Sequence, residues 1–230
     1  MKTKNFAFIF ARKRSKRLKN KNLKKLNGKS LFMHSVETAK KIREISKIFV
    51  STDDLKIKQE AKKNNCIIID RPKKLATAES PEWKSWKHAI NFAIEKFGDN
   101  FNFISIPPTS PLRHPNDIKK CIKAINRNYD IVITLRKSNL DPYFNMVMKS
   151  KEKILTFKKF TNEYMLRKNS YNIYSITTVA FVSKPIFILN NKNYFQGKVK
   201  GIVIPEQRAV DIDTKFDFDT AKAIIKRNIK

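Results

Sequence analysis

A stretch near the start of the sequence, FARKRSKRLKNKN (residues 10–22), is strongly cationic. Seven of its thirteen residues are Lys or Arg, and none is Gly. It therefore cannot form a Walker A loop or a GxGxxG turn, in which backbone N–H groups surround a phosphate. Any anion at this place must be held by side chains. Nucleic acid, a membrane surface and the phosphates of a small molecule all suit such charge, and a solvated basic loop needs no ligand.

A second feature is the acidic segment AVDIDTKFDFDTAKAII (residues 209–225). Asp211 and Asp213 alternate, and in an extended segment such residues point to one side about 7 Å apart. Two carboxylates at that spacing can share Mg²⁺, which takes one or two protein carboxylates together with substrate phosphates. Thr214 and Asp217 have the spacing of a capping box that begins a helix, so we expect Asp217 to be a cap. A pair of turn residues remains the alternative for Asp211 and Asp213.

A third feature is the loop SIPPTSPLRHP (residues 105–115), which follows a predicted strand. Its prolines restrict the backbone. Thr109, Ser110 and Arg113 offer hydroxyl groups and a planar set of donors, of which the guanidinium suits carboxylates and phosphates. The loop is either part of a binding site or a rigid turn.

Apolar runs of β type alternate with segments of helical period along most of the chain. The predicted strands cover residues 5–10, 46–52, 66–70, 101–106, 129–135, 175–183 and 199–205. The predicted helices cover residues 30–42, 54–64, 81–97, 115–126 and 215–228. The pattern weakens between residues 136 and 172, which indicates a flap or hairpin that leaves the main sheet.

This alternation predicts a three-layer α/β/α fold with a Rossmann-like, mostly parallel sheet, because strands that are apolar on both faces need helices on each side. The 230 residues suit one domain. In such sheets ligands bind at the carboxyl ends of the strands, and the first strand-to-helix loop is the usual phosphate site. The stretch 10–22 occupies that loop. A basic loop and paired carboxylates in one domain together favour metal-assisted nucleotidyl transfer.

The formal net charge of +30 raises the prospect of nucleic-acid binding. The Lys residues run from Lys2 to Lys230, however, and do not gather in one segment, so we interpret most of them as a general compositional bias. The longest apolar run near the start has only six residues, far short of a membrane span, and we expect a cytoplasmic protein without membrane insertion. Cys66 and Cys121 lack metal or redox spacing and are expected to be reduced thiols.

Several segments, in this order, resemble the acylneuraminate cytidylyltransferase family. ARKRSKRLKNKN matches the first loop of that family at the positions Arg12, Ser15, Lys16, Lys21 and Asn22. The other matching segments are FVSTDD (49–54), DRPKKLAT (70–77), PPTSPLR (107–113) and DIDT (211–214). Each motif is weak alone, but together they cover nearly the whole chain.

The resemblance implies a GT-A-like nucleotidyltransferase that converts CTP and a 3-deoxy-2-keto nonulosonic acid, such as N-acetylneuraminate or a legionaminate-like sugar, to a CMP-sugar and pyrophosphate for surface glycans. It also implies Mg²⁺ and a homodimer formed through residues 136–172. The implied nucleotide-binding residues are Arg12, Ser15, Lys16, Lys21, Asn22, Arg71 and Ser80. Arg12, Lys21 and Asp211 would be catalytic, and Asp211 and Asp213 would hold the metal. The candidates for contact with the sugar are Arg113, Tyr143, Asn145 and Arg167.

The sequence departs from the family pattern at a few places. Arg17 stands where the first loop usually has Gly, Pro107 stands where many members have Gln, and ITTVAFV (176–182) replaces an Asn-Gly-Ala stretch. DPYFNMV (141–147) is more similar to the branch that handles legionaminate-type sugars. A CMP-Kdo-type synthetase, a basic nucleic-acid-binding protein and an inactive relative therefore stay open as alternatives.

Overall fold

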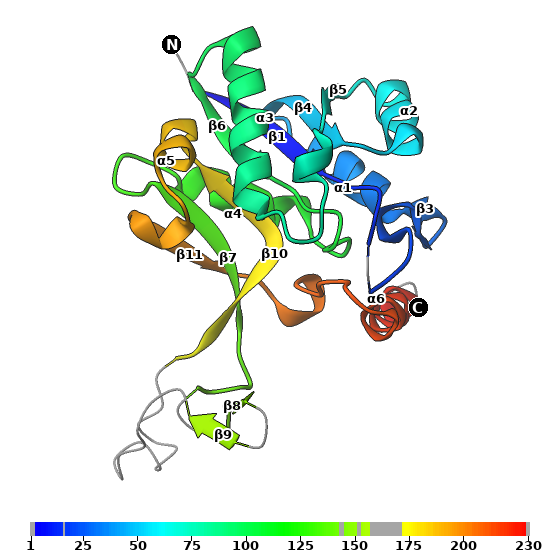
Figure 1. Cartoon of the computed structure of the whole chain (residues 1–230), viewed down its shortest axis with the longest axis vertical. Coiled ribbons are helices and arrows are strands. Elements are labelled where there is room, and N and C mark those ends of the chain that lie inside the picture. Colours follow the sequence, from blue (N-terminus) through cyan, green and yellow to red (C-terminus); the bar gives the residue numbers. More distant parts are fainter. Residues whose placement is uncertain (1–2, 16, 143–144, 151–152, 157–171, 229–230) are drawn as a thin grey trace.

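The computed structural model describes residues 3–15, 17–142, 145–150, 153–156 and 172–228. Its main feature is one seven-stranded sheet (Figure 1). The order across the sheet is β11 (Val199–Val203), β7 (Ile131–Lys137), β10 (Tyr174–Ser183), β6 (Phe101–Ser105), β1 (Lys4–Phe10), β4 (Ile45–Thr52) and β5 (Ile67–Asp70). All neighbouring pairs are parallel except those of β10, which runs antiparallel to β6 and β7. The predicted mostly parallel sheet is confirmed.

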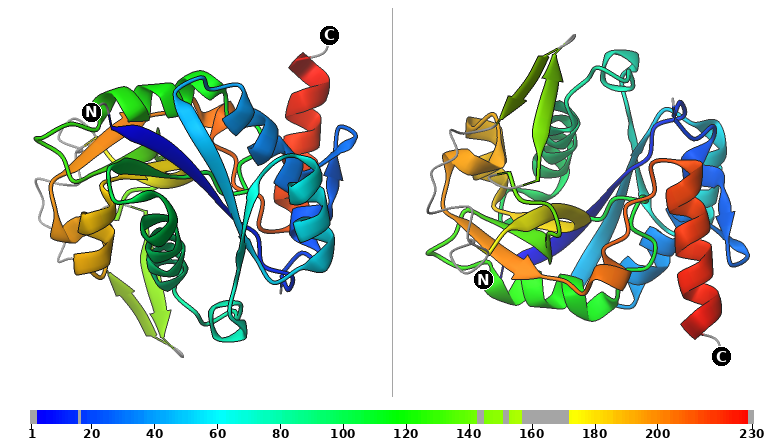
Figure 2. Two further views of the ribbon diagram at one scale, coloured as in Figure 1. Left: turned by 90° about the horizontal axis from the view of Figure 1, so that it is seen from above. Right: turned by 90° about the horizontal axis from the view of Figure 1, so that it is seen from below.

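Helices cover both faces of the sheet (Figure 2). One layer contains α1 (Leu31–Lys40), α2 (Leu55–Lys63) and α4 (Pro115–Ala124), and the other contains α3 (Glu82–Phe97) and α5 (Pro185–Asn190). The alternation of β1 explains this: Ala7 and Ile9 are buried in the first core, while Phe6 and Phe8 are buried in the second. The predicted three-layer architecture is therefore confirmed.

The last helix, α6 (Lys215–Asn228), lies beside the sheet and not over it (Figure 2). Its apolar side packs through Phe218 and Ala221 on Leu18, Leu26 and Leu31, which come from the loop after β1, from the short strand β2 (Lys25–Leu26) and from the start of α1. This small core fixes the basic loop and the acidic segment before α6 against each other.

An arm extends from the main body (Figure 1). Strands β7 and β10 continue as a two-stranded ribbon, and beyond them β8 (Val147–Ser150) and β9 (Lys153–Thr156) form a separate antiparallel pair. The prediction that the chain leaves the main sheet after residue 136 is confirmed for the described residues of this segment.

A short strand pair and a short helix were not predicted from the sequence. The short pair β2 (Lys25–Leu26) and β3 (Lys29–Ser30) is joined by Asn27 and Gly28, both with positive φ. Asn-Gly favours such a two-residue turn, so the signal was present. The other is the six-residue helix α5, which begins at Pro185.

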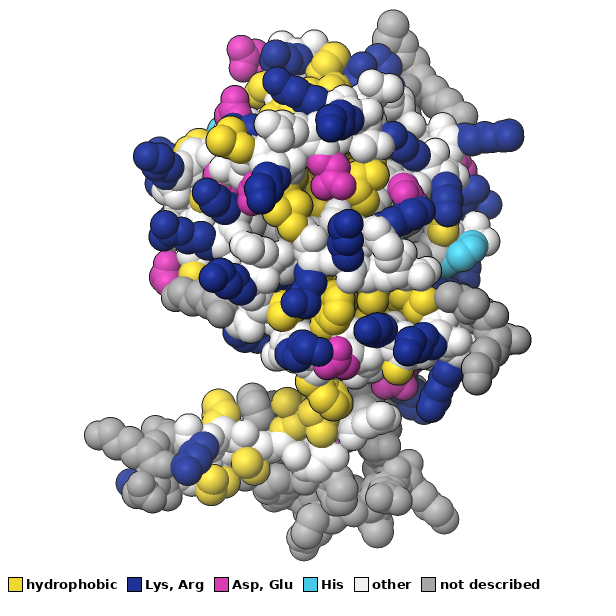
Figure 3. All heavy atoms as spheres, turned by 90° about the vertical axis from the view of Figure 1, so that its right-hand side faces the viewer, with side chains coloured by type: hydrophobic (Ala, Val, Ile, Leu, Met, Phe, Trp, Pro, Cys, Tyr) yellow, Lys and Arg dark blue, Asp and Glu magenta, His cyan; other side chains and the backbone are white. Residues whose placement is uncertain are grey.

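The positive charge is spread over the surface. On the face seen in Figure 3, Lys and Arg side chains are separated by apolar and uncharged surface and form no single block. Among the described residues, no helix has the length and apolar character needed to cross a membrane. Cys66 and Cys121 are both buried and unbonded to each other, in agreement with the predicted free thiols.

Candidate active site

A first cavity, of about 640 Å³, opens at the carboxyl ends of the central parallel strands. It is bounded by the loop after β1, residues 71–85, residues 107–109 and the segment before α6. The predicted residues that line it are Arg12, Ser15, Lys21, Asn22, Arg71, Ser80, Asp211 and Asp213. Lys16 lies outside the described residues. Four segments that are distant in sequence thus bring the predicted nucleotide and metal residues to one place.

The loop after β1 is held in shape by its own polar side chains. Asn22 is buried, and its Nδ2 donates to the Arg12 carbonyl oxygen at 2.9 Å. The Arg12 guanidinium in turn donates to the Thr77 carbonyl oxygen at 2.5 Å, which ties this loop to the segment after β5. The amide of Asn22 therefore shapes the loop, whereas Arg12 also faces the first cavity.

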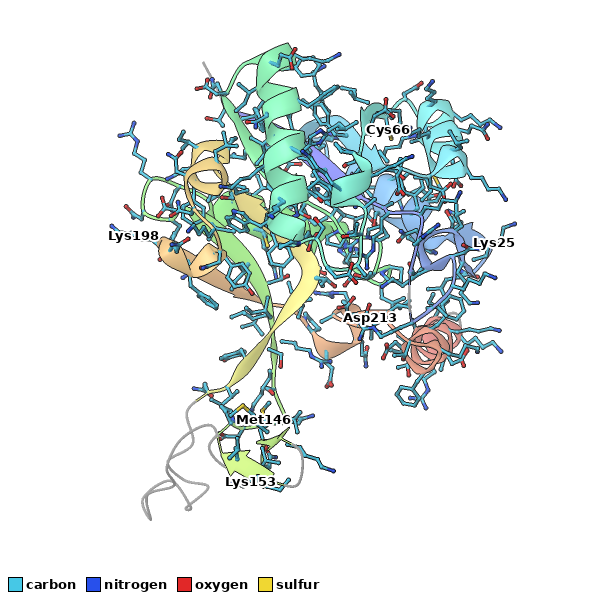
Figure 4. The ribbon with its side chains drawn as sticks, in the orientation of Figure 1. Lys25, Cys66, Met146, Lys153, Lys198 and Asp213 are labelled. Carbon is cyan, nitrogen blue, oxygen red and sulfur yellow. The ribbon has the colours of Figure 1, made fainter. Side chains whose placement is uncertain are left out.

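Asp213 connects the acidic segment to the basic loop. Its Oδ1 accepts from Lys21 Nζ at 2.7 Å and its Oδ2 accepts from Arg17 at 2.5 Å. Asp213 lies between α6 and the main body (Figure 4). Arg17, which replaces the usual loop glycine, is thus directed at one of the two predicted metal carboxylates.

The segment that carries both aspartates is fixed at each end. Ile212 N donates to the Thr109 carbonyl oxygen at 2.7 Å, which attaches the segment to the loop after β6. Asp217 accepts from Thr214 N and from Asp213 N, at 2.7 and 3.0 Å, while Asp217 N donates to Thr214 Oγ1. Burial alone would raise the pKa of Asp217, but these hydrogen bonds outweigh it and lower the pKa. The predicted capping box of the last helix is confirmed.

Asp211 and Asp213 face the same cavity. In the described part of the chain, no group of three or more His, Cys, Asp or Glu side chains is arranged to hold a metal. Two carboxylates nevertheless fit Mg²⁺, because that ion commonly completes its shell with water and phosphate oxygens. The donor set is therefore suited to a metal that arrives with a phosphorylated substrate.

Arg71 and Ser80 supply polar atoms without protein partners at the other end of the first cavity. Arg71 is 9% exposed; its Nε donates to Ser51 Oγ at 3.2 Å, and its guanidinium lies 5.5 Å from the centre of the Phe10 ring. Burial lowers the pKa of Arg71 to about 10, so it stays charged at neutral pH. One terminal nitrogen of Arg71 and Ser80 Oγ are buried and have no hydrogen-bond partner among the described residues, which suits them to polar groups of a ligand.

Comparison with known sequences agrees with this geometry. The sequence model of a family described as cytidylyltransferase matches residues 6–228. The chain belongs to the cytidylyltransferase family. This membership confirms the resemblance that the motifs of the sequence indicate.

The curated relatives of this chain differ in length. The N-acylneuraminate cytidylyltransferase of Escherichia coli O18:K1:H7 (strain RS218 / NMEC) is 27% identical over 227 residues, which are 97% of this chain and 52% of the relative. The chain thus spans about half the length of that relative. The CMP-N,N'-diacetyllegionaminic acid synthase of Campylobacter jejuni (serotype O:2, strain ATCC 700819 / NCTC 11168) is 28% identical over 221 residues, 94% of this chain and 93% of the relative.

A solved structure supports the fold. The CMP:2-keto-3-deoxy-manno-octonic acid synthetase complexed with CTP has a TM-score of 0.69 to this structure, with 98% of this chain and all of that chain covered. At 15% identity the likeness concerns the fold alone.

The sugar candidates are placed differently from the nucleotide candidates. Arg113 is 5% exposed, and it donates to Val179 O and Ser35 Oγ, each at 2.8 Å, and to Pro107 O. Burial lowers the pKa of Arg113 to about 9. Its donors hold the loop after β6 against β10 and α1, and it does not line the first cavity. The expectation that Arg113 contacts the sugar has no support from this position.

The remaining sugar candidates lie on the arm. Asn145 is exposed, accepts from the Asp141 backbone N–H at 2.6 Å and lines neither the first cavity nor the second cavity described below. Tyr143 and Arg167 lie outside the described residues. Contact between Asn145 and a sugar held next to Asp211 has no support from this position.

Other residues of the first cavity were missed by the sequence reading. Thr178 lines the cavity because β10 has a bulge after Thr177. Thr177 pairs with Thr134 of β7 and Phe181 pairs with Ile133, so residues 178–180 between them have no pairing partner on β7. The Thr178 hydroxyl hydrogen-bonds with that of Ser110 at 2.7 Å.

Glu82, at the start of α3, also lines the cavity. Its residue is exposed to solvent, but desolvation of the carboxyl group by the surrounding protein raises the pKa of Glu82. In the sequence, Glu82 indicates only an acidic residue in the first turn of a helix, where the helix dipole favours it, and nothing there indicates a binding site.

A second cavity, of about 500 Å³, lies on the other side of Asp211. It is lined by the ribbon of β7 and β10, the segment 206–211 and α6. Asp211 lines both cavities, and of the predicted site residues it is the one that they share.

Proposed function

We propose that this cytidylyltransferase joins the CMP part of CTP to a 3-deoxy-2-keto nonulosonic acid and releases pyrophosphate. The observation that carries the proposal is the meeting of a basic loop and two carboxylates in one cavity. The names of the E. coli and Campylobacter relatives support the substrate class. A CMP-Kdo-type activity has less support, because the likeness to that synthetase is one of fold at 15% identity.

The first cavity is proposed to hold CTP. Arg12 and Lys21, with Lys16 and Ser15 of the same loop, would bind the triphosphate, because phosphate oxygens bind strongly to charged donors. The unpartnered nitrogen of Arg71 and the unpartnered Ser80 Oγ would bind the cytidine. Asn22 would act mainly by keeping the loop in its observed shape.

In the proposed reaction, the C2 hydroxyl oxygen of the sugar acid forms a bond with the α-phosphorus of CTP. The bond between that phosphorus and the bridging oxygen to the β-phosphate breaks, and the hydroxyl proton leaves to solvent. Negative charge grows on the departing pyrophosphate, where Arg12 and Lys21 stabilise it. Asp211 and Asp213 would hold Mg²⁺, which when bound neutralises phosphate charge and lowers the pKa of the attacking hydroxyl. No histidine lines the described part of this cavity.

We further propose a homodimer that is formed through the arm, and a cytoplasmic location. The apolar side chains exposed on β8 and β9 support the dimer. The two buried free thiols and the use of CTP support the location.

The test is an assay of pyrophosphate release. The purified protein is incubated with Mg²⁺, each of the four nucleoside triphosphates and a panel that includes N-acetylneuraminate, N,N'-diacetyllegionaminate and Kdo. We expect release with CTP and a nonulosonate. Absence of pyrophosphate release with CTP and every nonulosonate contradicts the proposal. Faster release with Kdo than with the nonulosonates would show that the substrate is an octulosonate. Tight binding of DNA or RNA at physiological salt, without turnover, would favour a nucleic-acid-binding protein.

A further inference from the structure

We propose that Arg208 is a positioning residue for the reaction, and that its ion pair with Asp117 sets the place of Asp211 and Asp213 in the first cavity. This inference rests on the proposed function, since it names a residue that prepares the proposed metal site without touching a substrate. Neither Arg208 nor Asp117 lines the first or the second cavity. Any effect of this pair on the reaction must therefore pass through the backbone.

The ion pair has two hydrogen bonds. Arg208 lies directly before the acidic segment, and Asp117 lies in the first turn of α4. Arg208 Nε donates to Asp117 Oδ2 at 3.0 Å, and Arg208 Nη2 donates to Asp117 Oδ1 at 2.8 Å. Such a double contact fixes the orientation of the two groups as well as their distance. The Asp117 side chain is 1% exposed and that of Arg208 is 37% exposed, so the buried carboxylate is the anchor that holds Arg208.

Asp117 also holds the loop after β6. Its Oδ2 accepts from His114 N at 3.0 Å, as part of the capping box that begins α4. Residues 107–109 of that loop line the first cavity, and the Thr109 carbonyl oxygen accepts from Ile212 N at 2.7 Å. One carboxylate therefore connects two segments that both face the first cavity.

Asp211 lies between two fixed points of its own segment. On one side, Arg208 is held by the ion pair and Ala209 is buried in a small core. On the other side, Ile212 is buried and its N–H group is bound by Thr109. The Asp211 side chain accepts no hydrogen bond within the part of the chain that the structure describes. Its direction therefore depends on the backbone that carries it.

The proposed metal is sensitive to this placement. Mg²⁺ demands a nearly ideal octahedral shell, whereas Ca²⁺ accepts irregular shells of oxygen ligands. Groups that orient the ligands of a metal contribute roughly 10- to 100-fold to its affinity. Loss of the ion pair should therefore weaken the binding of Mg²⁺ more than the binding of Ca²⁺.

The variants separate the geometry of the pair from its charge and from the stability of the fold. Arg208→Lys keeps the positive charge but lacks the planar group that binds both carboxylate oxygens. Arg208→Gln removes the charge as well. Asp117→Asn, alone and combined with Arg208→Gln, tests whether the two residues act as one pair. Ile118→Val is the matched control, because Ile118 is buried next to Asp117 in α4 and its truncation lowers stability without changing the pair.

Metal binding is measured with CTP present and the sugar acid absent, so that no sugar is converted. Mn²⁺ binding is followed by electron paramagnetic resonance, and Mg²⁺ and Ca²⁺ are titrated as competitors. Calorimetry in EDTA measures the affinity for CTP without metal. Pyrophosphate release with N-acetylneuraminate and N,N'-diacetyllegionaminate measures turnover of the same samples.

For the wild type and Ile118→Val, we expect the same ratio of Mg²⁺ to Ca²⁺ affinity. Arg208→Lys and Arg208→Gln should weaken Mg²⁺ by about tenfold and Ca²⁺ by a smaller factor, with the metal-free affinity for CTP unchanged. Asp117→Asn should act in the same way, and the double variant should lose no more than either single variant, because both changes break one interaction. The concentration of Mg²⁺ needed for half-maximal turnover should change more than kcat at saturating Mg²⁺.

Wild-type metal affinities in Arg208→Gln, or in Arg208→Lys where Arg208→Gln does not fold, would overturn the inference. Equal losses for Mg²⁺, Ca²⁺ and CTP would also overturn it, because they would show a general loosening of the fold, and so would additive losses in the double variant. These results leave the proposed function intact as long as the wild type releases pyrophosphate. Absence of turnover by the wild type with CTP and every nonulosonate contradicts the proposed function instead, and absence of metal binding by the wild type contradicts both the metal site and this inference.

Discussion

At the scale of single residues, Asp213 is shared by two cations. Lys21 and Arg17 each occupy one of its oxygens. The Lys21 side chain is 13% exposed and the Arg17 side chain is 67% exposed, so the contact with Arg17 is the more easily broken. A metal ion that binds Asp213 must compete with Arg17 for its second oxygen.

This competition predicts the effect of Arg17→Gly. The concentration of Mg²⁺ needed for half-maximal turnover should fall by about two- to fivefold, because an exposed ion pair is worth up to about 1 kcal/mol. Titration of turnover with Mg²⁺, together with Mn²⁺ binding followed by electron paramagnetic resonance, measures the change. Arg14→Gly is the control, since Arg14 is exposed in the same loop and does not line the first cavity. Equal metal dependence in both variants would mean that Arg17 does not compete.

Asp211 leads to a second prediction. Asp211→Asn should reduce metal-dependent turnover by at least about 100-fold, because it removes one of the two carboxylates proposed for the metal. The midpoint of thermal unfolding should change little, since no hydrogen bond to the Asp211 side chain is present among the described residues. Pyrophosphate release and calorimetry measure the two effects, with Asp99→Asn at an exposed position as control. Turnover like that of the wild type would remove Asp211 from the metal site.

Single residues also show which features of the site cannot be predicted from the sequence. Arg12 and Lys21 follow a buried strand at the correct edge of the sheet, so topology alone placed them in the first cavity. Arg113 also follows a strand at that edge, but its side chain turns inward to backbone carbonyl groups. A motif fixes the position of a backbone segment, whereas the direction of a long side chain depends on the acceptors that the folded neighbours provide.

At the scale of elements, the start of α6 is held by the reciprocal contacts of Thr214 and Asp217. Asp217→Asn should lower the free energy of unfolding at pH 7 by about 1 kcal/mol, the usual contribution of a capping residue. The pKa of Asp217 in the folded protein lies below its ordinary value. Its contribution is therefore complete above the unfolded pKa and is lost as pH falls through the folded pKa.

Denaturant unfolding of the wild type and of Asp217→Asn between pH 7 and pH 3 tests this prediction. The stability difference should narrow toward the acid end. Asp219→Asn is the control in the same helix, because Asp219 forms an exposed pair with Lys215 and should have a smaller effect. A difference that stays constant with pH would show that the Asp217 charge does not stabilise the helix start.

The main elements could be predicted from the sequence because each has a clear period and length. The second cavity could not. It depends on the bulge of β10 after Thr177 and on the packing of α6 beside the loop after β1. Both arise from contacts between distant segments, and neither has a local pattern. The pair β2 and β3 had such a pattern in Asn27-Gly28, but its strands are only two residues long.

At the scale of the whole molecule, the arm carries a cluster of exposed apolar side chains. Val147, Met148, Ile154 and Leu155 on β8 and β9 are 43 to 61% exposed. Exposed apolar clusters commonly mark protein interfaces. Ile154→Lys should therefore shift the protein from dimer to monomer in sedimentation or light scattering, whereas Leu55→Lys, at a 72% exposed position on α2, should not. A wild type that is monomeric at micromolar concentration would contradict the proposed dimer.

The link between Lys21 and Asp213 joins residues that are 192 positions apart in the chain. A ribosome that adds about 5 to 20 residues per second needs roughly 10 to 40 seconds to cover that distance. During this time the newly made loop after β1 has neither the aspartates that line the cavity with it nor the helix that packs on Leu18. The proposed site is thus one of the last parts of the molecule to form during synthesis, and CTP bound as proposed would stabilise the finished chain but not the emerging one.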